Sequence, residues 1–360
     1  MMEFRHIILL GNYPSIAFGL LRSLKHKYNT YVISDSKNSV YYSKYCKKFL
    51  YARDWEDLLR VLKKESLHGG LIIPVTDYYV EFVNFHKAEL YQHHMLTSVG
   101  EDLQSLMDKY FSPKTLKKLG IKSLTTYFAG SVKLRKGETY IAKPRKSVGY
   151  TKDNFIVFSL KDEKHKIVKK LGDDYVVQKF YHNTNLFEVI GYYSNSSGIS
   201  EFLFLEKELI YPDKFGSTAA GITINPDTQL IMKLKKLFQK IKYEGFFDVE
   251  YFRHDGENFV IEINFRPGSP ILIAEKLIDN YILSINGKIS SVVSQHGLGK
   301  RVVHIPFVIL SGLQYMKLIN LRFLLSNYYM IIDTKDIFSS LVYCWSGAIE
   351  LFRKMVNFRK

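Results

Sequence analysis

The sequence predicts an α/β domain, an α+β part after it, and a helical tail. In the first hundred residues, short apolar runs alternate with amphipathic segments, as in a doubly wound parallel sheet. Residues 245–270 alternate apolar and polar positions on both sides of a turn, which is typical of an antiparallel hairpin. Residues 336–360 repeat apolar side chains at helical spacing. We therefore expect parallel strands first, then antiparallel strands, then helix.

Length and charge bound the class of protein. With 360 residues, 46% of them hydrophobic and 24% charged, the chain is long enough for two or three globular domains. The formal net charge of +16 is compatible with a nucleotide, an anionic membrane or a nucleic acid as partner. No nucleic-acid-binding module is recognisable, so we expect no nucleic-acid partner. Cys46 and Cys344 lack metal-ligand spacing, and the N-terminal apolar run is too short for a signal peptide, so we expect a cytoplasmic protein.

The N-terminal strands are expected at 6–11, 30–35 and 70–77, with helices at 16–26 and near 55–64. In a doubly wound sheet, the loops at the carboxyl ends of the strands meet at one edge. Here those loops carry polar or small residues, namely Gly11, Asn12, Asp35, Thr76 and Asp77. A dinucleotide site would need three glycines where Gly11 stands alone, and we reject it.

The hairpin at 245–270 brings carboxylates together. If it is symmetric about Gly256, Glu250 lies directly opposite Glu262. Alternation along the second strand divides the side chains into two faces, with Phe259, Ile261, Ile263 and Phe265 on one and Val260, Glu262, Asn264 and Arg266 on the other.

Facing carboxylates repel, so a cation between them would explain why both are present. Glu250, Glu262 and the Asn264 amide are hard ligands suited to Mg²⁺, with Mn²⁺ as the alternative ion. Arg266 could hold an anionic intermediate by a forked contact. The alternatives are a hairpin face that points at water, or a bulge that breaks the pairing.

Glu250, the Glu-x-Asn-x-Arg motif twelve residues later and the preceding Asp-Val-Glu strand resemble the metal-binding end of the ATP-grasp fold, shared by biotin carboxylase, carbamoyl-phosphate synthetase and D-alanine ligase. The resemblance implies ATP and Mg²⁺ as cofactors, and a place for the N-terminal loops on the acceptor-substrate side. It implies a pre-ATP-grasp domain at 1–105, an ATP-grasp domain at 106–298 with lobes at 106–175 and 176–298, and a basic C-terminal extension at 299–360.

The same resemblance assigns the phosphate-binding residues. Lys109 and Lys143 match the two lysines that reach the nucleotide phosphates, and Lys143 ends a predicted strand on the face opposite Tyr140 and Ala142. The following loop, with Ser147 and Gly149, corresponds to the flap over the phosphates, although it has fewer glycines than family members usually carry.

Further residues match the adenosine side of the family's site. Gln178, Lys179 and Phe180 correspond to the connector that holds adenine through backbone groups, and Glu188 resembles an acidic residue near the ribose. For Gln178 and Glu188, a polar residue at a strand edge is the alternative. A small-residue loop is expected at 216–221, similar to that of D-aspartate ligase-type enzymes, and an amphipathic helix is expected at 227–243.

The tail holds nine Lys or Arg and three acidic residues within 300–360. The apolar run of its C-terminal helix is interrupted by Glu350 and falls short of the ~20 residues that a membrane span requires. We expect it to dock on the protein's own core, with an anionic membrane surface as the alternative. The residues expected on its apolar face are Phe338, Leu341, Val342, Trp345, Ile349, Phe352 and Val356.

The resemblance to ATP-grasp enzymes implies an ATP-dependent carboxylate-amine ligase that acts through an acyl phosphate. Lys143 and Arg266 are the expected catalytic residues, and the partners are a small-molecule carboxylate and an amine, such as an amino acid or a surface-glycan precursor. A homo-oligomer is compatible with the sequence. The alternatives are an ATP-grasp enzyme that uses another nucleophile, and a non-catalytic nucleotide-binding or membrane-associated scaffold.

Overall fold

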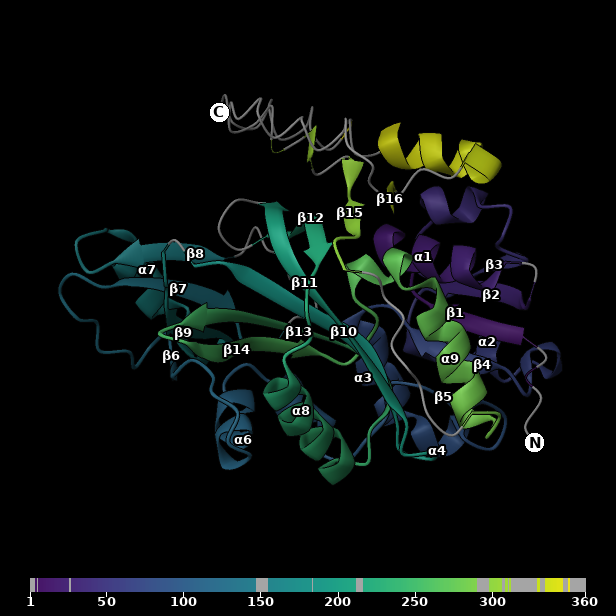
Figure 1. The fold of residues 1–360 in the computed structure, drawn as a ribbon, viewed down its shortest axis with the longest axis horizontal. Helices are drawn as coiled ribbons and strands as arrows, with labels where there is room; N and C mark the ends of the chain where they lie inside the picture. The colour runs from purple at the N-terminus through teal and green to yellow at the C-terminus, as the bar shows by residue number, and fades with distance from the viewer. Residues whose placement is uncertain are drawn as a thin grey trace.

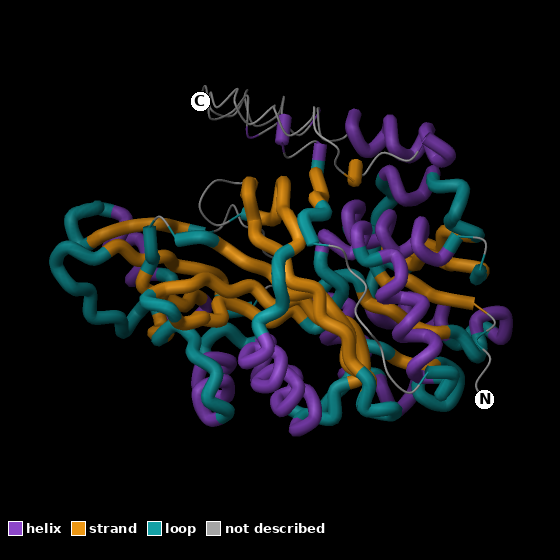
Figure 2. Tube along the Cα trace, viewed as in Figure 1, coloured by secondary structure: helices purple, strands orange, loops and turns teal. Residues whose placement is uncertain are grey.

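A computed structural model describes most of the chain, and three sheets form within that part (Figures 1 and 2). Their strand orders are β3-β2-β1-β4-β5, β6-β9-β7-β8 and β14-β13-β10-β11-β12-β15-β16. The described residues are 4, 6–25, 27–146, 155–182, 184–211, 216–289, 298–305, 308–309, 311, 329–330, 334–345 and 349.

The N-terminal sheet is parallel throughout and has helices on both faces, as predicted. Strands β3 and β5 were not predicted. Its strands are β1 (His6–Leu10), β2 (Asn29–Ser34), β3 (Lys48–Tyr51), β4 (Leu71–Pro74) and β5 (Met95–Leu96). One face packs on α1 (Pro14–Leu24), and the other on α2 (Trp55–Leu62) and α3 (Asp77–Phe85).

A four-stranded sheet and one helix form what we term the small lobe, which lies apart from the N-terminal sheet in Figure 1. It follows the short helices α4 (Lys87–Leu90), α5 (Leu103–Met107) and α6 (Ser112–Lys118). Its elements are β6 (Thr126–Phe128), β7 (Thr139–Pro144), β8 (Ile156–Ser159), α7 (Lys164–Lys170) and β9 (Tyr175–Lys179). The sheet therefore continues four residues past the expected boundary at 175.

The large sheet is mainly antiparallel. Its strands are β10 (Leu186–Ser194), β11 (Ser200–Tyr211), β12 (Ser217–Thr223), β13 (Glu244–His254), β14 (Glu257–Asn264), β15 (Arg301–Val303) and β16 (Tyr329–Met330). The loop expected at 216–221 was wrong, because these residues form most of β12 between β11 and β15. The predicted amphipathic helix is α8 (Thr228–Lys240), capped by Asp227, with Leu230, Leu234, Leu237 and Phe238 buried.

One hydrophobic core joins the N-terminal sheet to the large sheet. It contains α1, the short turn η5 (Ser269–Ile273) and α9 (Glu275–Ile285), which lie between the two sheets in Figure 1. Side chains of β1 and of β10 belong to this same core. The small lobe has a separate core of its own, built on β7, β8, β9 and α7.

The hairpin of β13 and β14 reaches its predicted register by an unpredicted route. Asp255 and Gly256 both have positive φ, as a two-residue hairpin turn of this kind requires, and residues nearest the turn pair about their midpoint. A register shift next to Tyr251 then admits Ile261 as an extra residue, and Glu250 pairs with Glu262. The bulge thus creates the predicted pair, and it also turns Val260 into the core, where we had expected it beside Glu262.

The tail contains a helix at 337–345 that follows η7 (Thr334–Asp336). This helix packs on the N-terminal domain, because Asp336 accepts a hydrogen bond from Ser43 Oγ (2.6 Å) and Tyr343 is buried in the shared core. Our prediction of the buried face was wrong, since Phe338, Leu341 and Trp345 are exposed. Phe352 and Val356 lie outside the described residues. No helix in the described part is long and apolar enough to span a membrane.

Candidate functional site

Three carboxylates form a row across neighbouring strands of the large sheet. Glu188 on β10 lies opposite Glu250 on β13, and Glu250 lies opposite Glu262 on β14. Directly opposed residues of adjacent strands project to the same face, so the three side chains share one surface. Like charges in this arrangement require compensation by nearby cations.

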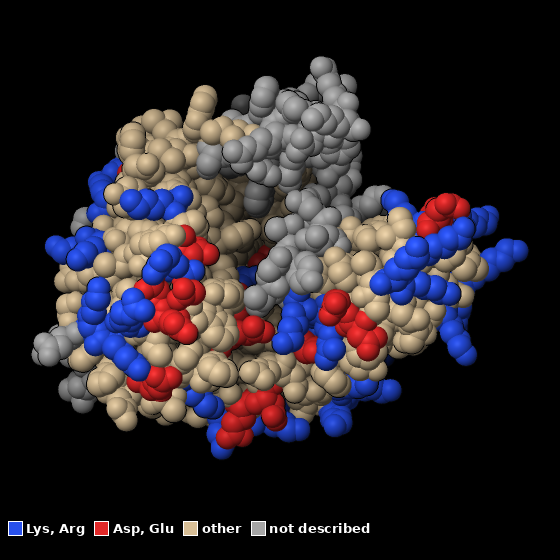
Figure 3. Space-filling model, turned by 180° about the vertical axis from the view of Figure 1, so that it is seen from behind, with Lys and Arg blue, Asp and Glu red and all other residues tan. Residues whose placement is uncertain are grey.

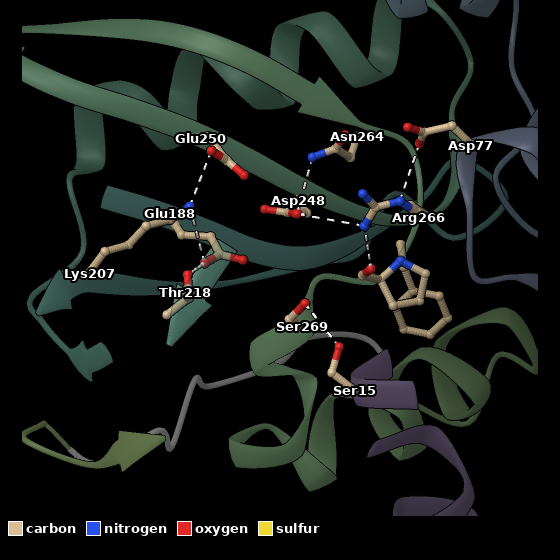
Figure 4. Close-up of polar contacts among 12 residues, drawn as sticks. Ser15, Asp77, Glu188, Lys207, Thr218, Asp248, Glu250, Asn264, Arg266 and Ser269 are labelled. Atoms are coloured by element: carbon tan, nitrogen blue, oxygen red, sulfur yellow. Dashed lines mark hydrogen bonds and ion pairs between the residues drawn. The ribbon is translucent and has the colours of Figure 1, made fainter. Parts of the chain in front are cut away.

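A second polar pair lies one strand repeat away. Asp248 on β13 is opposite Asn264 on β14, and the Asn264 amide nitrogen donates to Asp248 Oδ2 at 3.2 Å (Figure 4). Asp248 is 4% exposed, and its Oδ1 has no hydrogen-bond partner. Sequence analysis missed Asp248 as a site residue, although its position two residues before Glu250 places it on the same face.

Lysine 207 is the buried counter-ion of this row. Its Nζ lies 3.1 Å from Glu250 Oε2 and 3.9 Å from Glu188 Oε2, and its side chain is 1% exposed (Figure 4). Burial alone would lower the pKa of Lys207, but the charges of Glu250 and Glu188 outweigh it and raise the pKa above its ordinary value. Thr218 on β12 donates to Glu188 at 2.6 Å. Neither Lys207 nor Thr218 was predicted.

The N-terminal domain reaches the site through Asp77. Arg266 follows β14, and its Nε lies 3.2 Å from Asp77 Oδ1 while its Nη1 lies 3.8 Å from Asp248 Oδ2. Burial opposes the guanidinium charge, but the carboxylates of Asp77 and Asp248 raise the pKa of Arg266. Burial, together with the charges of Glu188 and Glu250, raises the pKa of Asp248 well above its usual range.

Lys109 completes the arrangement, with its Nζ 3.1 Å from Glu262 Oε1. The five carboxylates named above thus meet three cations, which are Lys109, Lys207 and Arg266. Carboxylates thus outnumber cations among these named groups, and such an arrangement suits a divalent cation.

The donor atoms also fit a hard cation. Glu250 and Glu262 offer carboxylate oxygens from facing positions, and the Asn264 amide can present its oxygen because its nitrogen already donates to Asp248. In the part of the chain that the structure describes, no group of three His, Cys, Asp or Glu side chains is arranged as a metal site. The predicted set therefore depends on the amide as its third protein ligand.

Four of the predicted nucleotide-binding residues lie on or directly after strands of the small lobe, namely Lys143, Gln178, Lys179 and Phe180. Lys143 on β7 is buried and projects to the same face as Ile141, two residues before it. Ile141 pairs with Gln178 on β9, so Lys143 and Gln178 also share that face. Gln178 donates to Thr126 Oγ1 at 2.9 Å, whereas Lys179 is exposed and lies 2.9 Å from Glu138. The Phe180 N–H donates to the Thr139 carbonyl at 2.8 Å. Ser147 and Gly149 lie outside the described residues.

A pocket opens beside the hairpin where the three parts of the molecule meet. It is lined by Asp77 and Glu81 of α3, Met107, Lys146 of the small lobe, and Glu262, Ile263 and Asn264 of β14. Burial raises the pKa of the Glu81 carboxyl. In Figure 3 the surface is hollowed between the small lobe and the rest of the molecule, and basic side chains gather on the outside of that lobe.

Comparison with solved structures finds similar chains. N5-carboxyaminoimidazole synthetase from Staphylococcus aureus, complexed with ADP, superposes with a TM-score of 0.66 at 18% identity, over 88% of this chain and 87% of that one. Biotin carboxylase from Campylobacter jejuni gives 0.60 at 16% identity, over 83% and 75%. L-amino acid ligase from Bacillus licheniformis gives 0.61 at 10% identity, over 84% and 79%. No protein-family model and no curated protein matches the sequence.

Proposed function

We propose that this chain, which has the predicted ATP-grasp fold, is an ATP-dependent carboxylate-amine ligase. The observation that carries the proposal is the register of β13 and β14, which sets Glu250 opposite Glu262 with Asn264 one repeat away. Lys109 lies 3.1 Å from Glu262, and Arg266, directly after β14, lies 3.8 Å from Asp248 one repeat along the same face. A cation site flanked by two cationic side chains is suited to handling phosphate groups.

Each part of the site has a proposed role in binding. Lys109 and Lys143 neutralise the nucleotide phosphates, and Glu250, Glu262 and Asn264 hold Mg²⁺ or Mn²⁺. When bound, the metal would neutralise charge on the phosphates. The other residues proposed to contact the nucleotide are Ser147, Gly149, Gln178, Lys179, Phe180 and Glu188. Glu188 lies opposite Glu250 in the carboxylate row. Besides its proposed contact with the nucleotide, Glu188 is therefore next to a proposed metal ligand.

The proposed reaction proceeds in two steps. The γ-phosphoryl group of ATP passes to the substrate carboxylate, and Arg266 stabilises the acyl phosphate. The amine then attacks the acyl carbon, so that a C–N bond forms and the C–O bond to phosphate breaks, releasing phosphate and a proton. Positioning and charge stabilisation account for most of such catalysis, so no nucleophilic side chain is required.

The test is ADP release with Mg²⁺-ATP over a panel of amino acids and uronic acids, alone and in pairs. Release that depends on one carboxylate and one amine establishes the ligase and names its substrates. Glu262→Ala should abolish this release without unfolding the protein, whereas Glu257→Ala, on the same strand but paired at the surface with Lys122, should leave it intact. Retained turnover in Glu262→Ala contradicts the assignment.

Other outcomes of the panel favour the alternatives. Release with a carboxylate but without any amine indicates an ATP-grasp enzyme that uses another nucleophile. Nucleotide binding without release on any substrate favours a surface-glycan acceptor outside the panel, or a non-catalytic scaffold. Purified precursors with a free carboxylate or amine would separate these two cases.

A finer part of the proposal is that the protein works at the inner face of an anionic membrane. Phe338, Leu341 and Trp345 are 60, 61 and 69% exposed, and the Tyr42 ring extends this apolar surface by packing on Phe338 at 5.4 Å. Lys335 is exposed beside it. Aromatic side chains with a basic margin suit the interface of an anionic bilayer. Failure to sediment with phosphatidylserine vesicles at low salt would count against this location.

A further inference from the structure

Two of the proposed binding residues are bound to each other. Lys109 Nζ lies 3.1 Å from Glu262 Oε1, and the two side chains are 10% and 23% exposed. The proposed function gives these groups different ligands, since Lys109 serves the nucleotide phosphates and Glu262 serves the metal. Each ligand therefore competes with the ion pair for one of its members.

The second lysine of the row is held in a different way. Lys207 projects from β11, inside the large sheet, and its side chain is enclosed at 1% exposure between Glu250 and Glu188. Lys109 lies in the segment between α5 and α6, outside all three sheets, with its N–H donating to the Arg145 carbonyl at 3.1 Å. Lys207 is thus enclosed within the sheet, whereas Lys109 lies on a connecting segment at the edge of the site.

We propose that the Lys109–Glu262 ion pair couples nucleotide binding to metal binding. Phosphate oxygens that draw Lys109 away leave the charge of Glu262 available to a divalent cation. A cation on Glu262 likewise leaves Lys109 available to phosphate. Each ligand therefore raises the affinity for the other by the same factor, since coupling between two sites is reciprocal. This inference rests on the proposed function.

The coupling predicts that loss of Lys109 raises the affinity for metal, whereas general damage to the site would lower it. Lys109→Met should weaken nucleotide binding, yet it should strengthen metal binding in the absence of nucleotide, because the ammonium group 3.1 Å from Glu262 is then removed. We expect about a 5- to 20-fold gain in Mn²⁺ affinity, within the usual range of coupling between sites. Lys109→Arg, which keeps the charge, should bind Mn²⁺ as the wild-type protein does.

The experiment is a Mn²⁺ titration of the full chain, with free Mn²⁺ followed by electron paramagnetic resonance, with and without saturating ADP. Lys122→Met is the matched control, because Lys122 pairs with Glu257 on the same strand as Glu262 and its loss removes one charge from the surface of that hairpin. Support requires that Lys109→Met alone binds Mn²⁺ more tightly without ADP and loses most of the increase caused by ADP. Circular dichroism confirms folding of each variant.

Two results would overturn the inference, and they differ in what else they affect. If ADP strengthens Mn²⁺ binding to the wild-type protein but Lys109→Met binds Mn²⁺ no more tightly than wild type, the coupling is wrong and the proposed metal site stands. If Mn²⁺ fails to bind to any variant, even with ADP, the metal site and the proposed function that depends on it fail together.

Discussion

Replacement of Lys207 by methionine tests whether the carboxylate row depends on an internal cation. The change leaves Glu250 and Glu188 without the ammonium that lies 3.1 and 3.9 Å from them. Removing one partner of a buried ion pair costs about 3–5 kcal/mol of unfolding free energy. We expect about 3 kcal/mol, because Glu250 retains 18% exposure and Glu188 keeps its hydrogen bond from Thr218. Methionine is also unbranched and of similar length, so the cost reports charge and not a cavity.

Urea unfolding at pH 7.5 in EDTA measures this loss without a bound metal. The raised pKa of Lys207 means that its contribution is complete below the unfolded value, about 10.4, and is lost only as the pH rises through the folded value. The measurement at pH 7.5 therefore records the full effect. A double-mutant cycle with Glu250→Gln should give a coupling energy of about 1–3 kcal/mol. A loss below about 1 kcal/mol, or additive effects in the cycle, would refute the reasoning.

Two further substitutions test packing and burial. Gly268→Ala places a Cβ 2.5 Å from Ile190 Cγ2 and 3.1 Å from Glu188 Oε1. Thermal unfolding should therefore show a loss of about 1–3 kcal/mol in the free energy of unfolding. Gly130→Ala, whose Cβ meets its nearest atom at 3.6 Å, should cost much less. Equal losses would contradict this. Burial lowers the pKa of His94 to about 4, so as the pH falls the unfolded chain binds a proton at this imidazole before the folded chain does. His94 should therefore lower the free energy of unfolding by about 2 kcal/mol between pH 7.5 and pH 5. His94→Gln should remove that part of the pH dependence in urea unfolding, and an unchanged slope would exclude the assignment.

The hairpin shows how far the sequence alone can carry a site. Alternation located both strands, and the count of residues from the turn placed Glu250 opposite Glu262, as the structure confirms. The bulge at Ile261 was not predictable from the pattern, because Val260 and Ile261 are both apolar and either could be the extra residue. The register near the turn and the register at the site differ by that one residue.

Site residues contributed by segments far apart in the sequence could not be predicted from sequence patterns. Lys207 and Thr218 meet Glu188 only because β10, β11 and β12 lie side by side, and sheet order is a property of the whole fold. The small residues of β12 locally favour a loop, but pairing with β11 and β15 holds them as a strand. Local preference is overridden here by the neighbouring strands.

The tail helix illustrates a different limit. Its apolar spacing identified a helix, yet periodicity cannot tell which face packs inward. Contact with the N-terminal domain is made by the opposite face, through Ser339, Ser340 and Tyr343, while Trp345 remains in solvent. Polar partners on the domain surface, such as Arg22 beside Ser340 at 3.2 Å, favour this orientation.

The division of hydrophobic cores determines how the molecule can deform. Because one core spans the N-terminal sheet and the large sheet, separating these two parts would expose buried side chains. The small lobe carries its own core, so a pivot about the chain segments before β6 and after β9 would open neither interior, although it would strain contacts such as the ion pair between Arg145 and Asp108. Lys143 lies on the small lobe, whereas Glu250 and Lys207 lie on the large sheet. Such a pivot would change the gap between Lys143 and the carboxylate row while leaving the buried ion pair of Lys207 and Glu250 undisturbed.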